Sequence, residues 1–278
     1  MGVFTSSLKK SIGKTISKYR YLPGIAGLDL LFLLLFGVIS FFFSLFAENH
    51  FVNVAESGGR LIPEITEALA EGKLPLSAFL SDQVVMSNLM SVASYAIIFA
   101  VFAYVIYILM QGSAWFITYK IANEKKKFKE FMPRFSLLSA RWTGIVAVYL
   151  FLAVLFVGIF LLRPEPSISS VLFSLVTEII NYVLLCIAFL SFAMLYSKKP
   201  IINSLKFIFK HPVRIISALF IIALAFYVNF GITFWIFNNL SFSATATGAY
   251  IAAFIRFLIA APFLAWARVF LIEIAKSK

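Results

Sequence analysis

A small set of polar side chains interrupts the long apolar stretches of this sequence. Glu178 and Arg256 each lie seven or eight residues from the end of such a stretch, which is roughly 10–12 Å along a helix. Asn181 follows Glu178 by three positions and shares its helical face, and Asn229 lies at a similar level of another stretch. Inside a membrane, such side chains bind ions or solutes, carry protons or hold helices together. We therefore treat Glu178, Asn181, Asn229 and Arg256 as one intramembrane polar layer.

Asp29 and Arg268 form a second candidate pair. Each lies near the basic end of an apolar stretch, where opposite charges can neutralise each other. The simplest interpretation of the pair and of the polar layer is that both hold helices together. The alternative is a path for a solute or a proton through the layer around Glu178.

Signatures of enzymes are absent from the sequence. Gly13-Lys14-Thr15 resembles the end of a phosphate-binding loop, but Leu8 stands where that motif needs its first glycine. His50 and His211 are the only histidines, and their separation excludes a zincin pattern. Cys186, the single cysteine, has no nearby histidine to activate it. We predict no catalytic activity, no cofactor and no metal site.

The elements that carry these residues are apolar helices. Of the 278 residues, 62% are hydrophobic and 13% are charged, whereas soluble domains are about half apolar and about a quarter charged. Six stretches of about 20 residues are long enough to cross a hydrocarbon core of roughly 30 Å. They cover about residues 24–46, 91–117, 142–162, 170–196, 215–236 and 249–272. Because a β-barrel would alternate apolar and polar residues, we predict an all-α integral membrane protein with six transmembrane helices.

The basic residues predict the orientation of the six spans. Of the 24 Lys and Arg residues, 20 lie before the first span, between spans two and three, between spans four and five, or at the C-terminal end. Basic residues next to spans remain in the cytoplasm. We therefore predict a multi-pass protein of the plasma or inner membrane, with both ends of the chain in the cytoplasm.

Short amphipathic segments lie outside the spans. Residues 1–23 form a basic cytoplasmic segment, and residues 24–278 form the membrane domain. On the outer side, residues 47–90 are predicted to form a small helical cap, in which Pro63 starts a short helix. Basic segments precede the odd-numbered spans at 7–18, 127–138 and 201–210. This spacing suggests three repeated hairpins, each preceded by a basic interfacial helix.

The basic cytoplasmic segments are the third candidate site. Lysines alternate there with apolar residues, a pattern typical of segments that contact anionic lipid headgroups. The candidates are Lys125, Lys126, Lys127, Lys206 and Lys210. A protein partner in a membrane complex could use the same charges, and the cluster at 125–127 is also explained as a topology determinant. Nucleic acid is not expected as a partner.

Two parts of the sequence resemble known membrane proteins. Residues 7–11 (SLKKS) and 28–33 (LDLLFL) are similar to the start of uncharacterised archaeal polytopic membrane proteins. Residues 200–212, which begin with PIINSLK and end with HP, resemble repeats in the membrane domain attached to some glycerophosphodiester phosphodiesterases. The resemblance covers about 60 residues and contains no catalytic motif. It implies six spans with basic segments before them, and no activity.

Together these patterns predict a non-catalytic membrane protein. It would be a subunit or scaffold of a membrane complex, whose basic cytoplasmic segments dock partners or contact lipid. The alternative is a permease-like or lipid-handling protein that uses the polar layer around Glu178 and Arg256. That layer favours the alternative, whereas the lack of glycine-flanked broken helices favours the subunit.

Overall fold

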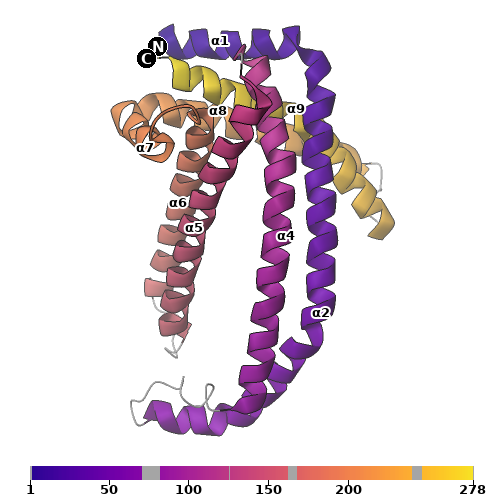
Figure 1. Ribbon diagram of the computed structural model, residues 1–278, viewed down its shortest axis with the longest axis vertical. Helices are drawn as coiled ribbons and strands as arrows, with labels where there is room; N and C mark the ends of the chain where they lie inside the picture. The colour runs from indigo at the N-terminus through magenta and orange to yellow at the C-terminus, as the bar shows by residue number, and fades with distance from the viewer. Residues whose placement is uncertain (1, 71–81, 125, 162–167, 240–245, 278) are drawn as a thin grey trace. The chain divides into compact units, whose positions relative to one another are not determined.

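A computed structural model describes residues 2–70, 82–124, 126–161, 168–239 and 246–277, and these residues are almost entirely helical (Figure 1). The helices are α1 (Gly2–Ser17), α2 (Leu22–Ala70), α4 (Gln83–Ile121), α5 (Phe128–Leu161), α6 (Ile168–Ala193), α7 (Pro200–Lys210), α8 (Pro212–Asn239) and α9 (Ala246–Lys276). One 3-10 turn, η1 (Tyr19–Tyr21), joins α1 to α2. No residue within the described ranges is in a strand. The prediction of an all-α protein is confirmed.

The chain divides into two compact units. The first unit contains residues 1–30 and 110–278, and the second contains residues 31–109. Their boundary crosses α2 and α4. The candidate residues Asp29 and Arg268 both belong to the first unit.

Within the part of the chain that the structure describes, five helices are long and apolar enough to cross a membrane. The spans are Tyr19–Ser57, Gln83–Ile121, Phe128–Ala153, Val176–Ala193 and Pro212–Ile232. Their apolar side chains are widely exposed, as in Ile97 at 66% and Phe220 at 65%, which a soluble monomer would not show on this scale. These helices indicate a multi-pass membrane protein. The sixth predicted span falls on α9, where the side chains of residues 251–254 and 256–258 lie outside the described residues.

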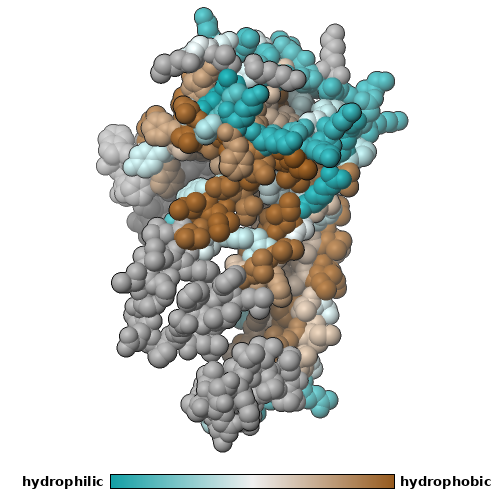
Figure 2. Space-filling model, turned by 90° about the vertical axis from the view of Figure 1, so that its left-hand side faces the viewer, coloured by the Kyte–Doolittle hydropathy of each residue, from teal (hydrophilic) through white to brown (hydrophobic). Residues whose placement is uncertain are grey.

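In the first unit, hydrophilic residues gather in Figure 2 at the end where α1 lies in Figure 1. Apolar side chains follow directly next to this end. Basic side chains beside an apolar band are typical of the boundary between lipid headgroups and hydrocarbon.

The core of the first unit lies where α2, α4 and α9 meet. Its fully buried members are Ile25, Ala114, Ile121, Ala265 and Val269. The two alanines let the helix backbones approach closely, as small residues do between membrane helices. Gly112 allows a similar approach to α5, because a Cβ atom there would lie only 3.0 Å from Cε of Met132. α9 also packs against α1, α6 and α8, so it is the central helix of this unit.

Aromatic side chains join α4, α5 and α6. The ring centroids of Phe135 and Phe192 are 5.0 Å apart, and those of Phe131 and Phe135 are 5.9 Å apart. The hydroxyl of Tyr119 donates to the carbonyl groups of Phe192 and Ala193, both at 2.8 Å. The last turn of α4 is thereby attached to the end of α6.

Prolines determine where the basic segments separate from the spans. Pro23 lies in the first turn of α2 and Pro212 begins α8, so α1 and α7 are separate helices. Proline is tolerated in the first turn because its missing N–H has no partner there. No proline follows Pro133 in α5, which runs without interruption from Phe128 to Leu161. The second of the three predicted hairpins therefore differs from the other two.

The second unit consists of the parts of α2 and α4 between residues 31 and 109. Aromatic contacts join the two helices: the ring centroids of Phe32 and Tyr107 are 5.8 Å apart, and those of Phe43 and Phe99 are 5.6 Å apart. Towards the other end, Nδ1 of His50 lies 2.7 Å from Oδ1 of Asn88.

The predicted outer cap is described only in part. α2 continues as one helix to Ala70 with Pro63 inside it, although the sequence predicts a new helix at Pro63. A proline inside a helix can bend it without ending it, and Figure 1 shows α2 bending before its C-terminal end. Residues 71–81 lie outside the described residues.

Candidate functional site

A buried ionic triad connects α2, α4 and α9. Arg268 donates from Nη1 to Oδ2 of Asp29 at 3.0 Å and from Nη2 to Oδ1 of Asp29 at 2.8 Å. Gln111 completes the triad, because its Oε1 accepts from Nη2 of Arg268 and its Nε2 donates to Oδ1 of Asp29, both at 2.9 Å. The residues are 3% (Asp29), 6% (Arg268) and 9% (Gln111) exposed. Asp29 and Arg268, paired by the sequence analysis, thus form an ion pair, and Gln111 is a partner that it did not identify.

The geometry of the triad is that of a link between helices. The planar guanidinium of Arg268 matches the two carboxylate oxygens of Asp29 and lies 5.8 Å from the ring centroid of Trp115. Both oxygens of Asp29 have a donor within the triad. Because a buried charge needs such compensation, the triad stabilises one relative position of the three helices.

The predicted polar layer is also described only in part. Glu178 and Asn181 occupy exposed positions on α6. The side chain of Arg256 lies outside the described residues. Asn229 is the one member whose side chain is buried in the described part of the chain.

Asn229 lies beside the turn of α9 that precedes Pro262. Its Nδ2 donates to the carbonyl of Ile259 at 3.4 Å, and Pro262 follows three residues later inside the same helix. Proline has no N–H and disturbs the hydrogen bonds of the preceding turn, and polar side chains of neighbouring helices compensate the freed carbonyl groups in membranes. Asn229 thus contacts the turn of α9 that precedes Pro262.

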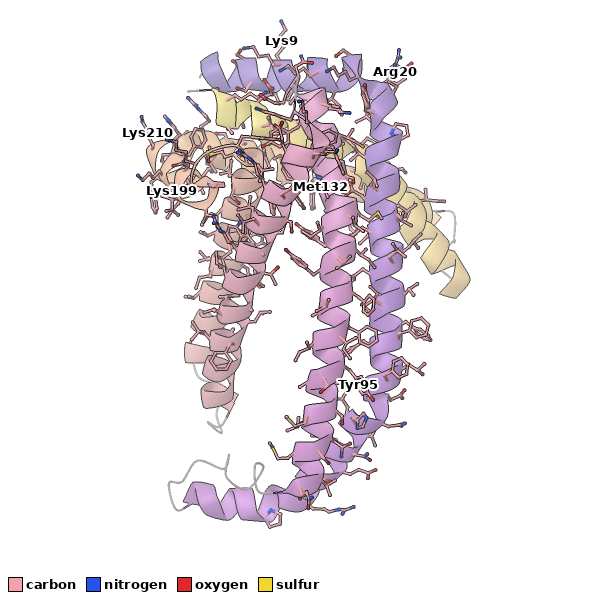
Figure 3. All side chains as sticks on the ribbon, in the orientation of Figure 1. Lys9, Arg20, Tyr95, Met132, Lys199 and Lys210 are labelled. Atoms are coloured by element: carbon pink, nitrogen blue, oxygen red, sulfur yellow. The ribbon has the colours of Figure 1, made fainter. Side chains whose placement is uncertain are left out.

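The predicted cytoplasmic segments meet at one end of the first unit. Nζ of Lys14 on α1 lies 2.8 Å from Oε1 of Glu273 on α9. Nζ of Lys276 lies 2.9 Å from Oε1 of Glu124, in the loop between α4 and α5. Figure 3 shows further basic side chains at this end, namely Lys9, Arg20, Lys199 and Lys210. The structure thus brings together the segments that the sequence assigns to one side of the membrane.

Several lysines at this end cap the C-terminal end of α4. Asn123 has a φ of 63°, and the backbone hydrogen bonds around it complete a Schellman motif. Lys14 and Lys276 both donate to the carbonyl of Ala122, at 3.3 Å and 3.0 Å. Lys18 donates to the side chain of Asn123. These lysines compensate the partial negative charge of a helix end and therefore have a structural function.

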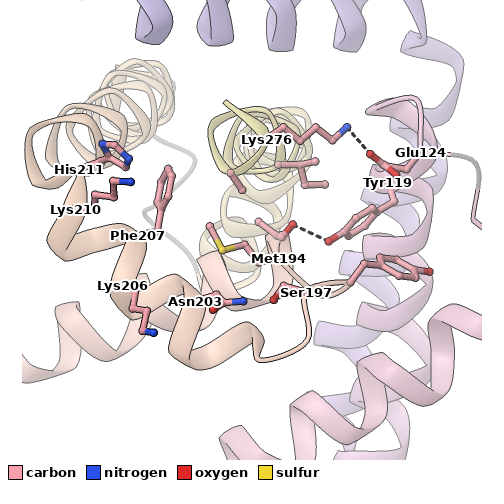
Figure 4. A pocket seen from close by; sticks show the side chains of 14 residues that line it. Tyr119, Glu124, Met194, Ser197, Asn203, Lys206, Phe207, Lys210, His211 and Lys276 are labelled. Carbon is pink, nitrogen blue, oxygen red and sulfur yellow. Dashed lines mark hydrogen bonds and ion pairs between the residues drawn. The ribbon is translucent and has the colours of Figure 1, made fainter. Parts of the chain in front are cut away.

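A cavity of about 740 Å³ opens beside this end, between α6, α7, α9 and the last turn of α4. Figure 4 shows Lys210 and His211 on one side of it and the Glu124–Lys276 ion pair on the other. Lys206 also lines the cavity. Among the residues that the structure describes, neither Lys206 nor Lys210 has an ion-pair partner. They lie four positions apart on α7, where like charges repel each other, so an anion in the cavity would relieve this repulsion.

Burial and nearby charges shift the pKa values of two titratable groups in the cavity. Desolvation, with the charges of Arg214 and Lys210, holds the pKa of His211 below its usual value. Burial alone would raise the pKa of Glu124, but Lys276 and Lys126 together hold it below its usual value. At neutral pH the cavity is therefore lined by three ammonium groups, one carboxylate and a neutral imidazole.

The other predicted lysines have different positions. Nζ of Lys126 lies 3.7 Å from Oε2 of Glu124 and 4.2 Å from the ring centroid of Tyr196. Lys127 is exposed just before α5, and Lys125 lies outside the described residues. Of the four candidate lysines that the structure describes, Lys206 and Lys210 line the cavity, and Lys126 and Lys127 do not.

The sequence analysis did not identify the uncharged polar residues of the cavity. Asn203 and Ser197 line it and supply an amide and a hydroxyl group. Asn203 precedes Lys206 by three positions, so the shared helical face is a signal that could have identified it. Ser197 lies in the turn after α6 and carries no such signal.

No group of three or more His, Cys, Asp or Glu that could hold a metal ion occurs in the described part of the chain. The chain matches no family model, no curated protein and no solved structure. Its function has to be inferred from the ionic triad and the basic cavity themselves.

Proposed function

We propose that this protein is a non-catalytic membrane protein that binds anionic lipid headgroups in the cavity between α6, α7 and α9. The proposal includes six spans in the plasma or inner membrane, with both ends of the chain in the cytoplasm. The cavity then lies at the level of the cytoplasmic headgroups, where clustered lysines attract anionic lipids.

The amphipathic character of α7 is the observation that carries this proposal. Ile202, Leu205 and Phe209 are 46%, 39% and 77% exposed and recur at the spacing of one helical face. A helix with an exposed apolar face beside basic residues is typical of the membrane interface. Lys206 and Lys210 belong to the same helix and line the cavity, so their ammonium groups would lie at the depth of lipid phosphates.

The chemistry of the cavity suits a phosphate group with a polar substituent. The ammonium groups of Lys206 and Lys210, which have no ion-pair partner among the described residues, can bind phosphate oxygens through charge-assisted hydrogen bonds. The amide of Asn203 and the hydroxyl of Ser197 can donate to or accept from the polar part of a headgroup. No catalytic step is needed to account for these residues.

Docking of a protein partner is the other use of the same lysines. It would make the protein a subunit or scaffold of a membrane complex, as the sequence analysis predicts first. A concave, partly polar cavity fits a small ligand, whereas protein interfaces bury broad surfaces. We therefore propose lipid binding as the function of this cavity.

Retention of lipid during purification tests the proposal. The protein is transferred from its native membrane into nanodiscs, and its bound molecules are identified by mass spectrometry. The variant Lys206→Gln/Lys210→Gln should bind anionic lipid about 30-fold more weakly, since each lysine near an anionic surface contributes about 1 kcal/mol. Lys198→Gln/Lys199→Gln is the matched control, because these two lysines are exposed next to α7 but do not line the cavity.

Equal retention of anionic lipid by both double variants would contradict the proposal. A stoichiometric protein partner that is lost only from Lys206→Gln/Lys210→Gln would assign docking to the cavity instead. Loss of lipid from both double variants would indicate attraction by overall charge and not by a site.

A further inference from the structure

We infer that the lipid bound in the cavity inserts an acyl chain into an apolar groove between α6, α8 and α9, so that one anionic phospholipid occupies both. This inference rests on the proposed function and extends it to the class of ligand. The groove has a volume of about 580 Å³, and apolar side chains make up nearly all of its lining. Its walls include Phe189 of α6, Phe220 and Ala223 of α8, and Leu271 of α9.

The groove and the cavity follow the same face of α6. Tyr182, Cys186 and Phe189 line the groove, and Ala193, the last residue of α6, lines the cavity. Successive members of this series are three or four positions apart, which places residues on one helical face. The groove therefore begins one helical turn from the cavity along α6.

The groove and the cavity also lie on one face of α9. Leu264, Ala267 and Leu271 line the groove, and Ala275 lines the cavity. These positions are again three or four apart, so they form one stripe of the helix. From Leu264 to Leu271 the groove extends over seven residues of α9, which is about 10 Å, in the direction away from the charged end.

The physical chemistry assigns different roles to the two parts. An acyl chain already lies in hydrocarbon, so the groove gains no transfer free energy and contributes only packing contacts. The headgroup loses little water at the interface and gains two ammonium partners, Lys206 and Lys210. The cavity thus sets the affinity for an anionic group, while the groove determines where the chain lies. The ligand is therefore a long-chain anionic phospholipid, as opposed to a free phosphate ion.

Cys186 provides a natural reporter for the groove. It is the only cysteine of the chain and lines the groove seven residues from Ala193 of the cavity. In detergent, dioleoyl phosphatidylglycerol should slow the alkylation of Cys186 by N-ethylmaleimide severalfold. Dihexanoyl phosphatidylglycerol, which has the same headgroup and short chains, should bind without slowing it. Binding of both lipids is measured by native mass spectrometry.

Two controls connect the protection of Cys186 to the cavity. Dioleoyl phosphatidylcholine, which has no net charge, should leave the alkylation rate unchanged. The variant Lys206→Gln/Lys210→Gln should lose the protection by dioleoyl phosphatidylglycerol. Equal protection by phosphatidylcholine would show that the groove takes chains independently of the cavity and would overturn the inference.

Photolabelling is the second measurement, and it does not depend on thiol reactivity. Phosphatidylglycerol with a diazirine in its acyl chain should label residues of the groove. Ala223→Trp, which fills the groove, should reduce this labelling at least severalfold, whereas Leu224→Trp, on the exposed side of α8, should not. Labelling confined to other surfaces would overturn the inference.

The failure of this inference is distinguishable from the failure of the proposed function. If dioleoyl phosphatidylglycerol binds in a manner that depends on Lys206 and Lys210 but neither protects Cys186 nor labels the groove, only the acyl-chain inference is wrong. If neither phosphatidylglycerol binds, the proposed function is wrong as well.

Discussion

Arg268 and Asp29, which are 239 positions apart in the chain, form a two-fold hydrogen-bonded ion pair with N–O distances of 3.0 Å and 2.8 Å. Both side chains are buried, and Gln111 donates to one oxygen of Asp29 and accepts from one nitrogen of Arg268. Each buried charge is compensated by the opposite charge of its partner, so removing either residue leaves the other charge buried without an ion-pair partner.

Removal of one charge of this pair should therefore be worse than removal of both. Asp29→Leu should lower the free energy of unfolding by about 3–5 kcal/mol, since it leaves Arg268 buried and uncompensated. Asp29→Leu combined with Arg268→Leu should recover most of this loss. Unfolding of the purified protein in mixed detergent micelles measures the difference, and strictly additive losses would contradict the coupling.

A side chain at Gly112 should press against α5 and cost stability. A Cβ atom there would lie 3.0 Å from both Cε and Sδ of Met132 and 3.1 Å from Cδ1 of Phe135. Gly112→Ala should cost about 1–3 kcal/mol through overpacking of the contact between α4 and α5, and a second substitution, Met132→Ala, should relieve part of this cost.

The matched control for this substitution is Gly144→Ala. A Cβ atom at Gly144 would have no atom within 4 Å, so the change should be neutral or slightly stabilising. Thermal unfolding of the three variants in detergent gives the comparison. A similar loss for Gly144→Ala would show that the cost does not come from the contact with Met132.

The Glu124 carboxylate should make stability fall at acidic pH. Burial opposes its charge, but Lys276 and Lys126 lower the pKa of Glu124 below its usual value of 4.5. The folded protein thus binds this proton less tightly than the unfolded chain does. The stability that the Glu124 carboxylate contributes is therefore complete above pH 4.5 and is lost as the pH falls through the lowered pKa. Glu124→Gln should lose less stability than the unsubstituted protein on acidification below pH 4.5, which melting temperatures across this range measure.

His211 should make the binding of anionic lipid stronger as the pH falls. Its pKa is held below the usual 6.5 by desolvation and by the charges of Arg214 and Lys210, so it is neutral at pH 7. A bound anion favours the imidazolium, hence binding takes up a proton and tightens as the pH falls towards and below 6.5. His211→Gln should abolish this pH dependence and leave the affinity at neutral pH unchanged.

The stability of the lipid-free protein should change with pH in the opposite direction to lipid binding, so it should decrease as the pH falls. Without an anion, folded His211 binds a proton less tightly than the unfolded chain does, so stability is complete above pH 6.5 and falls as the pH decreases through the lowered pKa. Equilibrium binding of phosphatidylglycerol and melting temperatures of the lipid-free protein measure the two effects. Binding that does not change with pH in this range would show that His211 does not face the ligand.

The apolar helices and the basic end are visible in the sequence. Hydropathy adds up along 20 residues whatever their tertiary neighbours are, so five of the predicted spans coincide with helices that are long and apolar enough to cross a membrane. Proline acts through its own ring and missing N–H, and the separation of α1 and α7 from the spans follows from Pro23 and Pro212. The pairing of Asp29 with Arg268 could be predicted because few ions lie in the apolar stretches, and each must find a partner.

The contacts between distant segments depend on the tertiary structure. Gln111 shares a face of α4 with apolar residues, and only the close approach of α2, α4 and α9 brings it to Asp29 and Arg268. Asn229 shares a depth with the other polar residues in the sequence, but helix packing places it beside the turn of α9 before Pro262.

The basic cavity combines the end of α4, the turn after α6, α7 and the end of α9. Charge and hydropathy are properties of each segment and can be read along the chain. Which segments face each other depends on the shapes of side chains at helix contacts, such as Gly112 against Met132, and these become defined only when the helices pack.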